Sequence, residues 1–150
     1  MIRQQNTKKV VVLKQQSVTN AGTLTSDLID TLGYDYCTIN VIGTTSDNAT
    51  NNPSVLKVME ADTTDSTNLA DITAFVGDGA SGFTIPSSPT ATTTAPFAEF
   101  NIDTRARKRY LAVKISPLTT QTFTVIAELG RPEQSPVSTT DRNVAVVVNG

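Results

Sequence analysis

The stretch that decides the fold is Asp103-Thr-Arg-Ala-Arg-Lys-Arg-Tyr-Leu-Ala-Val-Lys-Ile-Ser-Pro117. From Tyr110 on, apolar and other residues alternate, so that Leu111, Val113 and Ile115 share one face, opposite Tyr110, Ala112, Lys114 and Ser116. A period of two is typical of a β-strand with one buried face. Just before this strand, four of the five residues from Arg105 to Arg109 are cations. The stretch therefore predicts a strand that begins in a concentrated positive charge.

Short apolar runs with the same character recur along the chain, separated by turns and polar loops. They predict strands at Lys9–Lys14, Tyr34–Ile42, Ser54–Ala61, Asp71–Val76, Gly82–Ile85, Phe97–Ile102, Arg109–Ser116 and Thr122–Leu129, with a further apolar run at Asn143–Val148. The segment Thr23–Leu32 fits either a strand or a short helical turn. We expect the last three of the eight strands to form an antiparallel meander. Strands at a spacing of roughly ten residues predict an all-β fold, an antiparallel β-sandwich or jelly roll.

Length and composition restrict the function further. A chain of 150 residues suits one domain. Charged residues make up 17%, below the usual value of about a quarter, and the net charge is −2. An acidic chain without an apolar run of about 18 residues predicts neither general nucleic-acid binding nor a membrane span. The N-terminus has no signal-peptide core, which favours a protein made and assembled inside a cell.

Catalysis is not expected. The chain has no histidine, which excludes Ser–His and Cys–His nucleophiles and histidine-based metal sites. The single cysteine, Cys37, falls on the strand face of Ile39 and Val41 and is expected to be a small buried hydrophobe. No spacing singles out a pair of catalytic carboxylates. We expect neither enzymatic activity nor a cofactor.

Two loop features remain as weak alternatives. Aspartates at Asp62, Asp65, Asp71 and Asp78 offer oxygen ligands for a calcium ion, in a calcium-dependent or carbohydrate-active domain, but their spacing does not match an EF-hand. The segment Gly77–Gly82 is rich in glycine but lacks the lysine of a phosphate-binding loop, which favours a simple turn.

The basic cluster of Arg105, Arg107, Lys108 and Arg109 has three interpretations. It is a solvated turn, a docking surface for an acidic protein, or a nucleic-acid site. The third is disfavoured, because only Tyr110 nearby is able to stack on a base and no second basic patch extends the footprint.

The two ends of the chain form a separate question. Val10, Val11 and Val12 near the start, and Val144, Val146 and Val148 near the end, lie in short apolar runs. Such runs either close the edge of the sandwich or add to the sheet of a neighbouring chain. In the second case, residues 1–16 and 138–150 are arms, and both sets of valines are interface residues.

The sequence also resembles a known group of proteins. The resemblance is carried by Leu32-Gly-Tyr-Asp-Tyr-Cys-Thr-Ile-Asn-Val41, Asn52-Pro-Ser-Val-Leu-Lys57, Arg107-Lys-Arg-Tyr-Leu-Ala-Val113 and Gly130-Arg-Pro-Glu-Gln-Ser-Pro136, and covers residues 30–140. These segments are similar to small virion proteins of tailed bacteriophages, of the capsid decoration (cement) type.

The resemblance implies a structural protein that is assembled in the bacterial cytoplasm and binds the outer surface of an expanded capsid. Its partners would be the major capsid protein and itself, commonly as a homotrimer, with a dimer as the alternative. A head-fibre or tail-associated receptor-binding module is the alternative function, with the loops Gly43–Pro53 and Pro86–Pro96 facing a host glycan.

Overall fold

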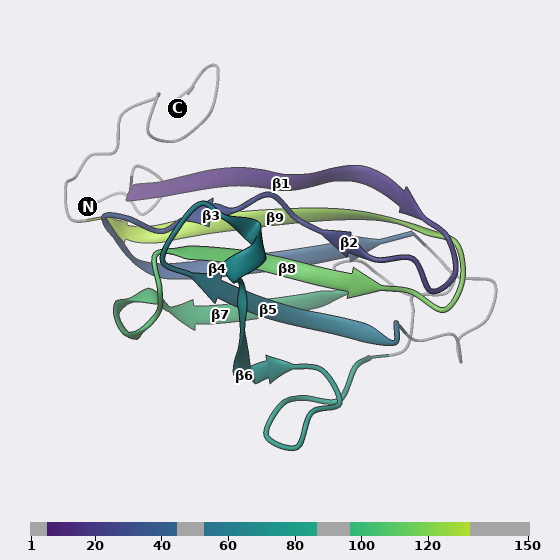
Figure 1. Cartoon of the computed structure of the whole chain (residues 1–150). Helices are drawn as coiled ribbons and strands as arrows, with labels where there is room; N and C mark the ends of the chain where they lie inside the picture. Colours follow the sequence, from purple (N-terminus) through teal and green to yellow (C-terminus); the bar gives the residue numbers. More distant parts are fainter. Residues whose placement is uncertain (1–5, 45–52, 87–96, 133–150) are drawn as a thin grey trace, which may run out of the picture.

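The computed structural model describes residues 6–44, 53–86 and 97–132, which form two antiparallel sheets packed face to face (Figure 1). The first sheet has the order β1 (Thr7–Val18), β9 (Gln121–Pro132), β4 (Tyr34–Gly43) and β7 (Ala98–Asp103). The second has the order β2 (Leu24–Thr25), β8 (Tyr110–Ser116), β5 (Val55–Ala61) and β6 (Ala70–Val76), and β3 (Ile29–Asp30) also pairs with β8. Short 3₁₀ turns, η2 (Ser66–Asn68) and η3 (Thr104–Ala106), follow β5 and β7. The predicted all-β sandwich is confirmed.

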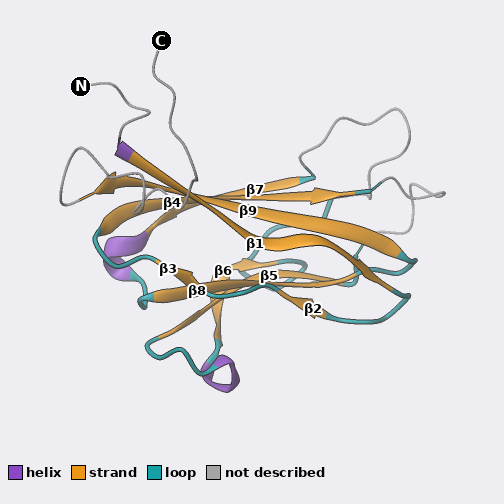
Figure 2. Cartoon of the chain, turned by 90° about the horizontal axis from the view of Figure 1, so that it is seen from above, coloured by secondary structure: helices purple, strands orange, loops and turns teal. Residues whose placement is uncertain are grey.

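The core lies between the two layers, which Figure 2 shows one above the other. Period-two alternation supplies it: Cys37, Ile39 and Val41 of β4 are fully buried. Along β9 every second side chain from Phe123 to Leu129 is buried in the same way. Burial of these apolar side chains drives the two sheets together.

The meander predicted for the last three strands is wrong. β7 pairs with β4 in the first sheet, β8 pairs with β5 in the second, and β9 returns to the first. Each strand therefore crosses to the opposite layer. Alternation identifies the apolar face of a strand, but the same face fits the inside of either sheet, so the pattern does not choose between pairing and crossing.

Two local predictions also change. Thr23–Leu32 forms two separate two-residue strands, β2 and β3, on either side of Ser26. Gly82–Ile85 is not a strand, since its pairing is a single bridge between Phe83 and Gly77.

Strand β8 is more deeply buried than its alternation predicts. Leu111, Val113 and Ile115 face the core, but Ala112 and Ser116 on the opposite face are buried as well. Only small side chains occupy these two outward positions, and only Tyr110 and Lys114 of that face are partly exposed. The exposed fraction of an outward-facing side chain depends on what lies over it, which alternation does not encode.

The sandwich has two lateral edges, and they differ. At one, which we call the closed edge, β1 lies beside β2 and β3 (Figure 2). There the Asp27 N–H donates to the Val12 carbonyl at 2.9 Å and the Ser26 N–H to the Val113 carbonyl at 2.9 Å, so one short segment bonds to both sheets. At the other, which we call the open edge, β6 and β7 are the outermost strands among the described residues.

Candidate functional site

The predicted basic cluster lies at one end of the sandwich, on η3 and the connection from η3 to β8, at the left in Figure 1. Each of its four cations pairs with a carboxylate: Arg105 with Asp103, Arg107 with Glu60, Lys108 with Asp62, and Arg109 with Asp30. A fifth pair, Arg131 with Asp35, lies at the same end, with 4.0 Å between nitrogen and oxygen. We call these five pairs the charged end.

Asp103 both caps and neutralises the turn that carries the cluster. Its carboxylate accepts from the backbone N–H of Arg105 at 3.1 Å and from Nε of the same residue at 2.9 Å. These hydrogen bonds hold the pKa of Asp103 down at about 2 and raise the pKa of the Arg105 guanidinium. Asp103 therefore caps the start of η3 and neutralises Arg105, the first cation of the cluster.

Arg109, the residue directly before β8, is joined to Asp30 of β3 through two parallel hydrogen bonds. Nε and Nη2 of Arg109 donate to the two Asp30 oxygens at 2.9 and 2.7 Å. The hydrogen bond from Arg109 is the main reason that the pKa of Asp30 is lowered. The guanidinium also lies 4.9 Å from the centroid of the Tyr110 ring. Such bidentate pairing fixes the orientation of both side chains.

Glu60 is the most enclosed carboxylate of the charged end, with 17% of its side chain exposed. It accepts from the Lys108 backbone N–H at 3.1 Å, and Arg107 Nη1 lies 3.8 Å from its other oxygen. Lys108 Nζ in turn lies 3.2 Å from Asp62. The end of β5 therefore holds the loop between η3 and β8 in place.

This pairing changes the meaning of the cluster. A nucleic-acid backbone is bound by unpaired cations, which neutralise its phosphates and displace its counterions. Here cations and carboxylates alternate over one surface. A surface of mixed sign is compatible with both remaining interpretations, a solvated turn and a docking surface for a protein. The geometry disfavours a nucleic-acid site more strongly than the sequence did.

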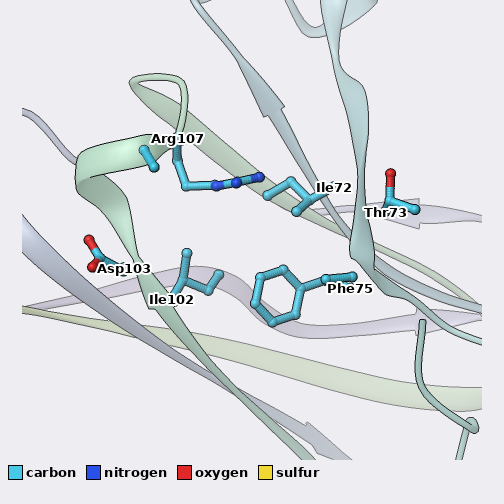
Figure 3. Close-up of a pocket in the computed structure, with 8 residues that line it drawn as sticks. Ile72, Thr73, Phe75, Ile102, Asp103 and Arg107 are labelled. Atoms are coloured by element: carbon cyan, nitrogen blue, oxygen red, sulfur yellow. The ribbon is translucent and has the colours of Figure 1, made fainter. Parts of the chain in front are cut away.

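A cavity of about 490 Å³ opens at the open edge, next to the charged end (Figure 3). Ile72 and Phe75 of β6 and Ile102 of β7 form its apolar wall, and Figure 3 shows Arg107 extending across it toward Ile72. The complete lining comes from β6, β7 and η3: Ile72, Thr73, Ala74, Phe75, Ile102, Asp103, Ala106 and Arg107. No local sequence pattern indicates this cavity, because it depends on which strands lie opposite each other.

The rest of the open edge is filled by the loop after β6. Phe83 and Phe75 each make an edge-to-face contact with Phe100, with centroids 5.4 and 5.9 Å apart. Ile85 is buried, and a Cβ on Gly77 would lie 2.3 Å from its side chain. The loop needs glycine at this close approach, so the glycine-rich segment is a tight turn.

Near the N-terminus, Val10, Val11 and Val12 lie in β1, which pairs with β9 from Thr7 to Val18. Val12 is buried in the core, Val10 packs against it, and Val11 is 42% exposed. Of the two alternatives for the N-terminal run, residues 7–16 form the edge strand of their own sandwich in this structure. The valines at 144, 146 and 148 lie outside the described residues, as does the segment 138–150.

The four loop aspartates do not meet. Asp62 pairs with Lys108, Asp71 lies 2.8 Å from Lys57, Asp65 caps η2, and Asp78 accepts from the Ile85 N–H. Within residues 6–44, 53–86 and 97–132, no three carboxylate or thiol groups gather where they would hold a metal ion. Aspartate serves turns and ion pairs at these positions.

Cys37 is buried, as its position in the strand predicted. Burial raises the pKa of its thiol to about 12. The thiol therefore stays protonated at neutral pH and is a poor nucleophile.

The described residues thus offer two surfaces for recognition, the charged end and the cavity at the open edge. None of the helices in the described part of the chain has the length and apolar character needed to cross a membrane. No protein-family model matches the sequence, and no curated protein is significantly similar to it.

Proposed function

We propose that the protein is a noncatalytic structural component of a virion, which binds and stabilises the outer capsid surface of a tailed phage. The major capsid protein is its partner in this proposal, together with further copies of itself as a homotrimer. Assembly would take place in the cytoplasm of the bacterial host. The resemblance of residues 30–140 to decoration proteins supports this function.

The observation that carries the proposal is the charged end. Five ion pairs from β3, β4, β5, β7, η3, β9 and the loops after β5 and η3 lie there, with between 17% and 70% of each side chain exposed. Exposed pairs of this kind add little to the stability of a monomer. They present both signs of charge in a fixed arrangement, which suits recognition of one protein lattice and rejection of others.

The test compares two charge changes at opposite ends of the sandwich. Arg107→Glu with Lys108→Glu reverses two charges at the charged end, and Lys14→Glu, which reverses one charge on β1 toward the far end, is the control. We expect wild-type protein and the control to occupy expanded capsids equally in a virion reconstruction. Occupancy of the double variant should fall at least tenfold, because like charges would face the partner.

Folding has to be checked separately, since Arg107 and Lys108 both contact Glu60. Arg107→Gln with Lys108→Gln keeps the backbone hydrogen bond to Glu60 without reversing charge, and a melting curve shows whether either variant still folds. Wild-type protein that fails to bind its own capsids refutes the function. Density at the tail would instead support the head-fibre or tail alternative, and unchanged occupancy of the folded double variant would remove the charged end from the contact.

A further inference from the structure

Leu32 is the most exposed large apolar side chain of the described residues, with 65% of its surface accessible to water. The others that are well exposed are Val11, Tyr36 and Leu118. Leu32 follows Asp30 by two residues and so lies directly beside the charged end. A single exposed leucine in a loose loop needs no explanation, but the turn that carries Leu32 is not loose.

Hydrogen bonds hold this turn in one conformation. The Tyr34 N–H donates to the Thr31 carbonyl at 3.0 Å, and Gly33 between them has a φ of 81°, as at the third position of a type II turn. The Leu32 N–H donates to Oδ1 of Asp30 at 3.1 Å. The backbone on both sides of the leucine is therefore fixed.

Arg109 ties the base of the turn to the sandwich. The N–H and the hydroxyl of the buried Thr31 both donate to the Arg109 carbonyl, at 3.0 and 2.7 Å. The Arg109 side chain in turn donates to both oxygens of Asp30. A segment that is ordered before binding loses little further conformational entropy when it binds. The fold therefore presents Leu32 as a preorganised apolar contact beside an ion pair.

The groups around Leu32 describe the partner that would bind it. Ion pairs give an interface selectivity, whereas much of its affinity comes from a few side chains that are buried in the complex within a polar rim. A guanidinium has five N–H donors, and Asp30 accepts from two of those of Arg109. A protein with a leucine-sized apolar pocket, and with a carboxylate or backbone carbonyl at its rim for Arg109, matches this surface.

We propose that Leu32 is the apolar anchor of the capsid contact and enters such a pocket on the major capsid protein. This inference rests on the proposed function, because it assigns the anchor within the same binding surface. The ion pairs of the charged end determine which surface is accepted, and the leucine supplies a large share of the affinity. Leu118, in the turn between β8 and β9 at the opposite end of the sandwich (Figure 1), lies outside the contact.

The same substitution at the two exposed leucines tests the anchor. Leu32→Ser and Leu118→Ser each remove a side chain that lies outside the core, so both variants should fold, and melting curves check this. Binding to expanded capsids is measured by cosedimentation over a range of protein concentrations. We expect Leu32→Ser to raise the Kd by about tenfold or more, and Leu118→Ser to change it by less than about twofold. An equal Kd for the two variants would overturn the proposal.

A second pair of variants tests the fixed presentation while Leu32 stays in place. Valine is strained at the positive φ of Gly33, whereas asparagine tolerates this region. A Cβ at Gly33 would meet no atom within 4 Å beyond its chain neighbours, so the strain is confined to the turn. Gly33→Val should weaken capsid binding and Gly33→Asn should preserve it. Equal binding by both folded variants would contradict the preorganised turn.

The outcomes separate this inference from the function on which it rests. Wild-type protein that binds capsids no better than Leu32→Ser refutes the anchor and leaves the function standing. Wild-type protein that does not bind its own capsids refutes both. A change in the oligomeric state of free Leu32→Ser, measured by sedimentation, would place Leu32 between copies of this chain and overturn its assignment to the capsid.

Discussion

The core between the two sheets is bordered differently at the closed edge and at the open edge of the sandwich. At the closed edge, the Ser26–Asp27 segment bonds to Val113 in one sheet and Val12 in the other, and Ile29 beside it is fully buried. At the open edge, Ile72 and Ile102 border a cavity. At the closed edge, backbone hydrogen bonds join the two layers, whereas the described residues of the open edge leave a cavity between them.

The closed edge is also protected from pairing with other chains. The register of β1 against β9 shifts between Val11 and Leu13 and again before Gln16. Gln15 takes a positive φ of 41°, as expected at such an irregularity. Bulges and edge lysines hinder the addition of a further strand. Of the two edges, the open edge is therefore better suited to the docking of another segment.

The largest loss in free energy of unfolding is expected when a buried isoleucine is shortened at each edge, with Ile29→Ala at the closed edge and Ile72→Ala at the open edge. Both side chains are buried, with 0% and 3% exposed. Removal of three carbons costs about 2.4 kcal/mol in transfer free energy. Ile29→Ala adds a new void and should reach about 4 kcal/mol, whereas Ile72→Ala, next to an existing cavity, should cost little more than the transfer term alone. Urea denaturation measures both, and equal losses would mean that the two edges are equally well packed.

A smaller loss is expected from Ser26→Ala at the closed edge. The buried Ser26 hydroxyl accepts from the Val113 N–H at 3.0 Å and donates to the Asp27 carbonyl at 2.9 Å. The variant leaves the Val113 N–H without this acceptor, which should lower the free energy of unfolding by about 1–3 kcal/mol. Ser17→Ala, at an exposed position of β1, should change it by less than about 0.5 kcal/mol. Similar values for both variants would show that Ser26 does not help to close this edge.

The smallest effect concerns Asp30, next to the closed edge. Its pKa is lowered in the folded protein, chiefly by the hydrogen bond from Arg109. The pair therefore stabilises the fold above the unfolded pKa of about 3.9, and this stabilisation is lost as the pH falls through the lower folded value. In melting curves between pH 6 and pH 2, Asp30→Asn should lose less of its Tm than wild type. High salt should reduce this difference. If Tm falls equally with pH in the two proteins, the ion pair adds nothing to stability.

Sequence patterns predicted the strands better than their partners. Alternation located β4, β5 and β9 within a few residues and identified the buried face of Cys37, Ile39 and Val41. It also located β7 and β8, but placed them wrongly in one meander. Strand pairing is a long-range choice between layers that present equivalent apolar faces, so a local pattern does not contain it.

The charged cluster shows the same limit at the level of a site. Four neighbouring cations were visible in the sequence, whereas their carboxylate partners Asp30, Glu60 and Asp62 lie far away along the chain. Only Asp103 and Arg105 are local enough to be anticipated from the capping position. A run of cations in the sequence therefore suggests a stronger positive potential than the folded surface has, because carboxylates distant in the chain pair with it.

The sequence by itself determined the fold class, the buried and unreactive state of Cys37 and the lack of histidine chemistry, because these depend on residue type and local period. The tertiary structure decided which strands pair, which cations are compensated and which edge stays open. Those properties arise from contacts between residues distant in the chain, where loop paths and sheet order choose the neighbours. The run from Asp103 to Pro117 contains both kinds of information: its strand is local, and its role at the charged end is not.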